Sequence, residues 1–285
     1  MKQYLGIIGG SGLYSMKDFV FDERLTIDTP YGLPSTPLMA GKLAGVDCVF
    51  LARHGEGHVF SPSEVNFRAN IWAMKKVGVK AIFSVSAVGS LREDIHPGHM
   101  VVIDQYIDRT KIRPSTFFEK GIVAHVSMAR PVSQYLRELL IASCRSLKIT
   151  YHEKGTYVCI EGPQFSTMAE SHFYRSLGAA VVGMTNLQEA KLAREAEIDY
   201  ATLALSTDYD CWHPDHDHVT VDQVVAVVRA NALNAQRILA DAVKKFDFSK
   251  KLECEGILKG AIMTHHEYIK PDVIKRLEPI IGKYF

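Results

Sequence analysis

The stretch VKAIFSVSAVGS, residues 79–90, begins as a β-branched apolar run and ends in small polar residues. Further apolar runs of this kind lie at residues 4–10, 46–55, 99–108, 179–186 and 200–208. Longer segments with helical periodicity separate these runs. Nearly continuous apolar strands that alternate with helices are typical of a sheet covered by helices on both faces. The sequence therefore predicts an α/β fold.

Length and composition restrict the class of protein. A chain of 285 residues with 47% hydrophobic composition can form one substantial core, and its formal net charge is only +1. No run of like charges indicates a nucleic-acid or membrane-surface patch, and no run of about 18 uncharged apolar residues predicts a transmembrane helix. The start, MKQYLGIIGG, is too short an apolar stretch for a signal peptide. Five widely spaced cysteines without a CxxC pair fit reduced thiols, so we expect a cytoplasmic protein that binds a small ligand rather than nucleic acid or membrane.

Capping motifs predict where several helices begin. SPSE at 61–64 and TMAE at 167–170 have the spacing of a capping box, and residues 220–223 repeat it before a long apolar-periodic segment. No linker or internal repeat divides the chain, so we expect one domain over residues 1–285. Residues 247–285 are expected to form a C-terminal helical extension in which Pro271 starts a helix.

Small and polar residues follow the predicted strands. Ligands bind at the carboxyl ends of strands in open α/β sheets, so these positions form the candidate site. The glycine-rich loop at residues 9–12 and the hydroxyl of Ser11 can face an anion. Arg53 offers a planar fork that matches phosphate, and His54 adds a donor. Ser86 and Thr185 add hydroxyls from neighbouring strand ends.

Two other interpretations of these residues remain open. The first is structural: Arg53 pairs with a carboxylate and His54 is satisfied in the core. The second is a dinucleotide site, which Asp28 would suit as a ribose ligand, although the loop lacks the third glycine of a G-x-G-x-x-G motif. A Walker A lysine is also absent.

The segment LALSTDYDCW, residues 203–212, places Asp208 and Asp210 just after a buried strand. If the chain stays extended, both carboxylates point to one side and Tyr209 to the other. They can be solvated, bind a metal, act as an acid and base pair, or accept hydrogen bonds from a heterocycle. The nearby HPDHDH, residues 213–218, contains possible metal ligands, but a solvated loop is the favoured interpretation.

Several motifs together resemble a known family. The motifs are GIIGGSGLY, LARHG, SPSEVNFRANIWAMKKVG, SVSAVGSL, DQYIDRT, IEGPQFST, GMTNLQEAKLAREAEI and STDYDCW, in collinear order over about residues 5–245. They resemble the 5'-methylthioadenosine phosphorylases, a branch of the trimeric purine nucleoside phosphorylase family. The resemblance implies a single domain with a twisted mixed β-sheet flanked by helices, of the phosphorylase/hydrolase-like type.

The resemblance also implies an activity and an assembly. The expected enzyme is a pentosyltransferase that splits 5'-methylthioadenosine with phosphate into adenine and 5-methylthioribose 1-phosphate, in methionine and purine salvage. Phosphate is a co-substrate, and no cofactor or metal is implied. The expected assembly is a homotrimer, which can pair into a dimer of trimers.

Site residues follow from the matching motifs. The phosphate site is expected at Ser11, Arg53, His54, Ser86, Ala87 and Thr185. The nucleoside is expected at Phe165, Met184, Asp208, Asp210 and His125, with His125 lent to a neighbouring subunit. Ser166 and Val221 are expected to tune specificity. The chain departs from the family pattern at Gly183, where asparagine is common, and at Gln164, where arginine is common.

The chemistry of adenine favours an aspartate at position 208. Its carboxyl can accept from the exocyclic amine of adenine and, when protonated, donate to N7 as the base leaves, so Asp208 is the expected catalytic acid. This role requires a raised pKa, which burial and Asp210 would supply. An asparagine would suit a 6-oxopurine. The nearest alternative is a purine nucleoside phosphorylase acting on adenosine or 6-oxopurine nucleosides; a nucleoside hydrolase and a non-catalytic sensor are less favoured.

Overall fold

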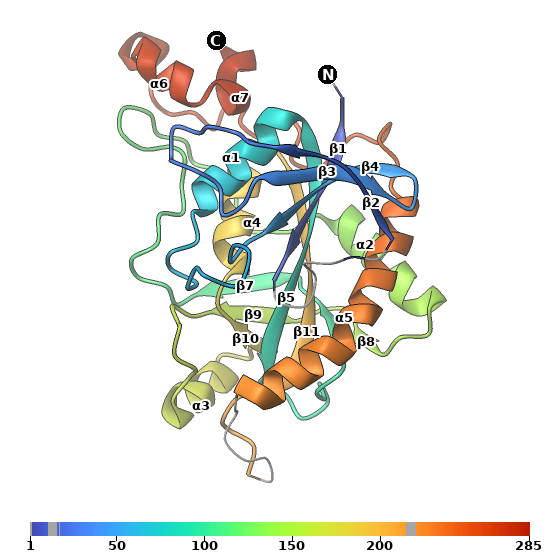
Figure 1. Cartoon of the computed structure of the whole chain (residues 1–285). Helices are drawn as coiled ribbons and strands as arrows, with labels where there is room; N and C mark the ends of the chain where they lie inside the picture. Colours follow the sequence, from blue (N-terminus) through green and yellow to red (C-terminus); the bar gives the residue numbers. More distant parts are fainter. Residues whose placement is uncertain (1, 11–15, 17, 215–220) are drawn as a thin grey trace.

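The computed structural model describes residues 2–10, 16, 18–214 and 221–285 (Figure 1). Its centre is β5 (Val79–Ser90), the apolar run at residues 79–90. On one side β5 pairs in parallel with β1 (Tyr4–Gly9), which pairs in parallel with β4 (Val46–Ala52). On the other side it pairs in parallel with β11 (Asp199–Asp208). The core strands are therefore those that the sequence predicts.

The outer strands make the sheet mixed. β10 (Val181–Gly183) pairs antiparallel with the end of β5, and β9 (Thr156–Cys159) pairs in parallel with β10. The remaining strands are β2 (Phe19–Leu25), β3 (Leu38–Leu43), β6 (Met100–Val102), β7 (Gln105–Asp108) and β8 (Tyr151–His152). Together they form an 11-stranded sheet. The predicted run at 99–108 is thus two strands, and the predicted single α/β domain with a mixed sheet is confirmed.

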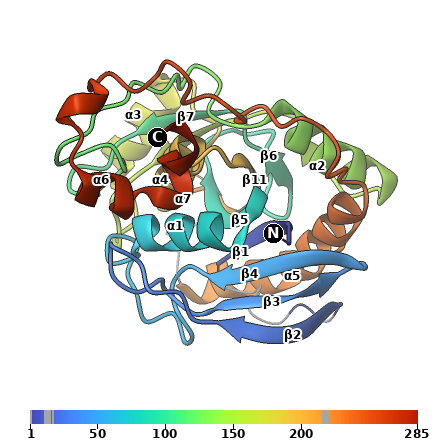
Figure 2. The same cartoon turned by 90° about the horizontal axis from the view of Figure 1, so that it is seen from above.

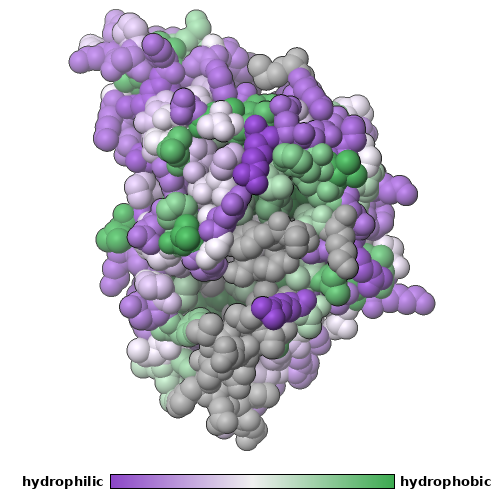
Figure 3. Space-filling model, viewed as in Figure 1, coloured by the Kyte–Doolittle hydropathy of each residue, from purple (hydrophilic) through white to green (hydrophobic). Residues whose placement is uncertain are grey.

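Helices cover both faces of the sheet (Figures 1 and 2). The core on one face includes residues of α1 (Phe67–Val77) and α4 (Asn186–Glu195), and that on the other includes residues of α2 (Gln134–Ser146) and α5 (Val221–Lys244). The short helix α3 is Met168–Ser176. Within the described ranges, no helix is both long and apolar enough to cross a bilayer. On the face in Figure 3, hydrophilic residues surround separate apolar patches.

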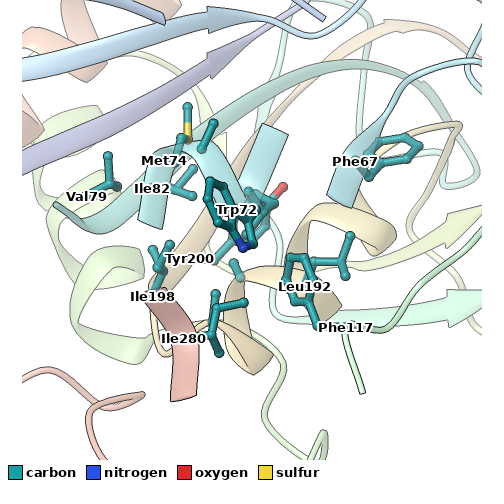
Figure 4. Packing of buried hydrophobic residues seen from close by; sticks show 14 of the residues in the cluster. Phe67, Trp72, Met74, Val79, Ile82, Phe117, Leu192, Ile198, Tyr200 and Ile280 are labelled. Carbon is teal, nitrogen blue, oxygen red and sulfur yellow. The ribbon is translucent and has the colours of Figure 1, made fainter. Parts of the chain in front are cut away.

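The C-terminal extension packs into the core. Its helical parts are η1 (His266–Tyr268), α6 (Pro271–Arg276), α7 (Glu278–Ile281) and η2 (Gly282–Tyr284), with turns and irregular chain before them. Pro271 starts α6, as the sequence predicts. Trp72 of α1 packs beside Ile280 of α7 (Figure 4), and its indole N–H donates to the Arg276 carbonyl at 3.0 Å.

The predicted helix starts have different outcomes. The box at Thr167 and Glu170 forms and starts α3. The prediction at Ser61 is wrong: Glu64 accepts from the Ser61 amide at 2.9 Å, but the two residues close a turn. α1 begins later, where the side chain of Asn66 accepts from the Ala69 amide at 3.2 Å. The predicted cap at Thr220 lies outside the described residues.

Candidate active site

The carboxyl ends of the central strands form one edge of the sheet. β4, β1, β5 and β11 are parallel neighbours, and their register pairs Ala52 with Gly9 and Asp208 with Gly89. The residues that follow these strands therefore lie side by side along this edge. β10 runs antiparallel to β5 from Ser90 backwards, which brings Thr185 to the same region.

Arg53 is buried at this edge and held by four hydrogen bonds. Its Nε donates to Glu189 at 2.6 Å, and its Nη2 donates to Glu189 at 3.1 Å and to Ser84 at 2.6 Å. Its Nη1 donates to the Val85 carbonyl at 2.8 Å. Among the described residues, these partners leave one N–H of Nη1 unassigned. Nη1 lies against the glycine loop, because a Cβ at Gly10 would be 3.1 Å from it.

Glu189 of α4 is the carboxylate partner that the structural interpretation of Arg53 requires. It is 2% exposed, against 1% for Arg53. Besides Arg53 it accepts from the Ser84 hydroxyl at 2.7 Å, the Tyr200 hydroxyl at 2.8 Å and the Asn186 amide at 3.3 Å. A buried pair with this many hydrogen bonds fixes the guanidinium in place. The sequence does not identify Glu189, because it lies 136 residues beyond Arg53.

His54 is buried and neutral. Burial and the neighbouring charge of Arg53 lower its pKa to about 4. Its Nδ1 lies 2.8 Å from the Phe60 carbonyl, which can only accept, so Nδ1 carries the proton. Nε2 of the neutral ring is then an acceptor. The ring would therefore meet phosphate as an acceptor, in contrast to the donor role expected from the sequence.

The hydroxyl candidates lie on neighbouring elements. Ser86 and Ala87 are in β5, where the Ser86 side chain is buried and donates to the Ala87 carbonyl at 3.2 Å. Thr185 is buried at the N-terminus of α4, and its side chain does not cap that helix. Its amide donates to the hydroxyl of Tyr157 at 3.3 Å.

The two aspartates meet at the end of β11. Gly89 makes room for them, since a Cβ there would lie 2.9 Å from a carboxyl oxygen of Asp208 and 3.2 Å from Cβ of Asp210. Asp208 accepts from the Thr207 hydroxyl at 2.5 Å and from the Asp210 amide at 2.8 Å. Burial raises the pKa of Asp208 to about 6; these hydrogen bonds oppose the increase, and the charge of Asp210 adds to it.

The chain does not stay extended past Asp208. Asp210 has φ 51° in the left-handed region, yet both aspartate side chains lie against Gly89 and Tyr209 points elsewhere. The Tyr209 hydroxyl contacts His96 and donates to the Glu93 carbonyl at 3.4 Å. Burial also raises the pKa of Asp210, while the hydroxyls of Ser171 and Ser166 beside it act in the opposite direction. The predicted specificity residue Ser166 is therefore next to an aspartate of the site.

Arg113 links the sugar and base candidates, and sequence reasoning missed it. Its guanidinium is bound to Met184 and to the segment after β9. It donates to the Met184 carbonyl, to the Ile160 carbonyl at 3.3 Å and to the Glu161 carboxylate at 3.0 Å. The same segment continues to Phe165, whose side chain is 49% exposed. No sequence motif distinguishes Arg113 from other loop arginines.

The remaining predicted residues are His125 and several that fall outside the described part of the chain. His125 is exposed on a segment that pairs with the C-terminal extension, where its amide donates to the Ala261 carbonyl at 2.9 Å. Ser11 and residues 215–218 of the HPDHDH stretch are outside the described residues, as is the side chain of Val221. Within the described part of the chain, no cluster of three or more His, Cys, Asp or Glu residues could hold a metal ion.

Comparison with known proteins identifies close relatives. The model of the "Phosphorylase superfamily" matches residues 4–244. The S-methyl-5'-thioadenosine phosphorylase of Geobacter sulfurreducens is 50% identical over the full length of both chains, and that of Koribacter versatilis is 52% identical over all of this chain and 98% of its own.

Solved structures agree with the sequence comparison. A methylthioadenosine phosphorylase from an Antarctic soil metagenomic library has a TM-score of 0.92 at 49% identity, with 98% of each chain covered. The methylthioadenosine phosphorylase of Schistosoma mansoni, solved in complex with adenine, has a TM-score of 0.88 at 36% identity and covers 92% of this chain and 99% of its own. The chain thus shares its fold with the two solved structures and about half of its residues, over its full length, with the two bacterial phosphorylases, and it belongs to the phosphorylase superfamily.

Proposed function

We propose that this chain is a 5'-methylthioadenosine phosphorylase, a pentosyltransferase that uses phosphate to split 5'-methylthioadenosine into adenine and 5-methylthioribose 1-phosphate. Full-length relatives at about 50% identity carry this activity in their names. The observation that carries the proposal is the placement of a half-buried, titratable carboxyl, Asp208, on the same sheet edge as the buried guanidinium of Arg53. Such an edge suits an anionic nucleophile at one end and a leaving base at the other. We further propose a place for the enzyme in methionine and purine salvage.

The phosphate end supplies position rather than activation. Phosphate already carries the attacking charge, so it needs to be held below the sugar carbon in line with the leaving base. We assign it to Ser11, Arg53, His54, Ser86, Ala87 and Thr185. Nη1 of Arg53 has an N–H for an oxygen of the anion, and Nε2 of His54 can accept from the hydroxyl of hydrogen phosphate.

The base end supplies a proton. As the N-glycosidic bond breaks, negative charge develops on adenine, and a protonated Asp208 can donate to N7 while its other oxygen accepts from the amine. Asp210 and Phe165 complete the base site, and Met184 lies at the sugar. A pKa of about 6 leaves a useful fraction of Asp208 protonated near neutral pH. We assign Ser166 and Val221 to specificity.

We also propose a homotrimer in which His125 contributes to the neighbouring subunit's site. His125 is exposed, and apolar side chains next to it, Val123 and Met263, are exposed as well. These two segments are joined, since the Met263 amide donates to the Val123 carbonyl at 2.9 Å. Sedimentation analysis of the wild-type protein should give the mass of a trimer or of paired trimers. We place the enzyme in the cytoplasm, because its five thiols are free.

The test is release of adenine from 5'-methylthioadenosine with and without phosphate, beside adenosine and inosine. We expect release that requires phosphate and is fastest from 5'-methylthioadenosine. Faster release from inosine would instead support a purine nucleoside phosphorylase for 6-oxopurines. Release without phosphate would support a hydrolase, and either result would contradict the proposal.

A further inference from the structure

Tyr157 is a buried phenol next to two of the proposed phosphate-binding residues. It lies in β9 and is completely buried. The Thr185 amide donates to its hydroxyl at 3.3 Å. The Ser86 hydroxyl lowers the pKa of Tyr157, against the larger effect of burial, which raises it. β9 pairs in parallel with β10, where Tyr157 lies opposite Val181. The phenol of Tyr157 extends along β10 and contacts the backbone at Gly183.

Gly183 is a glycine because of this phenol. A Cβ at position 183 would lie 2.6 Å from Cζ of Tyr157 and closer still to its hydroxyl oxygen. Real Cβ atoms do not approach other atoms so closely, and the buried ring cannot move aside without displacing its neighbours. Tyr157 and Gly183 therefore form a matched pair. The pair accounts for the departure from the asparagine that is common at this position of the family pattern.

We propose that Tyr157 is a positioning residue for phosphate, which orients the Ser86 hydroxyl and the Thr185 segment towards the anion. This inference rests on the phosphorolytic function proposed above. The Thr185 N–H donates to the phenol oxygen at 3.3 Å, which leaves the phenol proton for another acceptor, and in this proposal that acceptor is the Ser86 oxygen. The Ser86 proton, which points to the Ala87 carbonyl at 3.2 Å, can then turn to a phosphate oxygen. Hydrogen bonds in such a chain strengthen one another.

The first test is Tyr157→Phe, which removes one oxygen atom and keeps the ring. Loss of a net hydrogen bond predicts that KM for phosphate rises about threefold to tenfold. KM for 5'-methylthioadenosine should stay within about twofold of the wild-type value, since the phenol acts only through Ser86 and Thr185. An unchanged ratio of the two KM values would overturn the inference.

The matched control is Tyr284→Phe. The Tyr284 hydroxyl donates to Glu197 at 2.5 Å in the C-terminal extension, away from the strand ends. This control loses a phenol hydrogen bond as well, so Tm should fall while the ratio of the two KM values stays as in the wild type. A shift of the ratio in the control equal to that in Tyr157→Phe would attribute the effect to general destabilisation and overturn the inference.

The second test uses the matched pair itself. Gly183→Ala should lower Tm and weaken phosphate use, because the new methyl group collides with the phenol. Adding Tyr157→Met to Gly183→Ala should restore Tm without restoring KM for phosphate, because methionine removes the ring and supplies no hydroxyl. Gly183→Ala with wild-type Tm and kinetics, or a double variant with wild-type KM for phosphate, would contradict the inference.

Parallel assays of the wild type separate the two proposals. If wild-type adenine release does not depend on phosphate, the proposed function fails. If it depends on phosphate but Tyr157→Phe retains the wild-type ratio of KM values, only the role of Tyr157 fails.

Discussion

The phosphate end and the base end of the candidate site hold their charges in opposite ways. At the phosphate end, Arg53 is neutralised by Glu189 in a buried network, and the pKa of His54 is lowered to about 4. The charges there are constant near neutral pH. At the base end, two carboxyls share a turn, and the pKa of Asp208 is raised to about 6.

This difference follows the two tasks of phosphorolysis. The nucleophile brings its own charge, so the protein gains by keeping its surroundings rigid. The leaving base needs a proton, so the protein gains by keeping a group that can change its protonation state. One end is therefore built for a fixed electrostatic state and the other for a variable one. The variants below test this contrast.

Loss of the carboxyl at the base end should have the largest effect. Asp208→Ala should lower kcat for adenine release by roughly 10² to 10⁴, because it removes the proton donor to N7. The measurement is the steady-state rate with saturating phosphate and 5'-methylthioadenosine. A decrease below about fivefold would show that the base leaves without this acid.

At the phosphate end, loss of the buried negative charge should lower the stability of the fold. Glu189→Gln leaves the buried Arg53 without its counter-charge and should lower the free energy of unfolding by about 3–5 kcal/mol. Urea denaturation measures this change. As a control, Glu278→Gln breaks the exposed ion pair with Lys76 (3.0 Å) and should cost less than about 1 kcal/mol. Equal costs for the two variants would contradict the contrast between a rigid and an exposed pair.

At the base end, loss of a negative charge should instead raise the stability of the fold near neutral pH. The folded pKa of Asp208 lies above the usual 3.8, so the folded state binds a proton between pH 3.8 and about 6 that the unfolded state has lost. Stability from this group is present at low pH and is lost as pH rises through about 6. Asp208→Asn should therefore raise the free energy of unfolding at pH 7.5 by about 1–3 kcal/mol, with little gain at pH 4.5. A constant difference from the wild type across this range would refute the assignment.

Turnover should follow the same titration. If protonated Asp208 is the acid, kcat/KM falls above about pH 6. Asp210→Asn removes a neighbouring negative charge, so this limb should move about half to one pH unit lower, and in Asp208→Asn it should disappear. A pH profile with unmoved limbs in both variants would count against Asp208.

Arg113 should give the smallest effect, since it acts through other residues of the site and not on the reacting atoms. Arg113→Lys keeps the charge but loses the planar fork that joins Met184, Ile160 and Glu161. KM for the nucleoside should rise about twofold to fivefold, with KM for phosphate unchanged. Arg137→Lys is a matched control, because Arg137 also bridges carbonyls, of Ile103 and Glu153, outside the site. Equal kinetic changes in both variants would remove Arg113 from the site.

The sequence predicts the central sheet because its strands are apolar over their whole length. β5 and β11 are buried almost throughout, so composition alone identifies them. β2 escapes prediction because it is an edge strand with a mostly exposed, polar sequence, FVFDERL. The start of α1 is misplaced because the spacing of Ser61 and Glu64 also suits an isolated turn.

The site is predictable where residues follow strands and not where they meet across the fold. Arg53 and Asp208 stand at strand ends, and their type indicates their chemistry. Glu189, the partner of Arg53, and Arg113 cannot be identified in this way, because they are ordinary charged residues in the sequence until folding brings them to the edge. Gly183 likewise looks like a departure from pattern until the position of Tyr157 explains it.

The C-terminal extension shows that the folded core continues beyond the end of the family model. The family model ends at residue 244, yet Leu258, Val273 and Ile280 lie in the same apolar cluster as Trp72 of α1. A chain cut where the family model ends would expose that face of α1. The part of the chain that the superfamily model describes is therefore shorter than the packed core, while relatives such as that of Geobacter sulfurreducens match the full length, so a cut or insertion at residue 244 would divide one core.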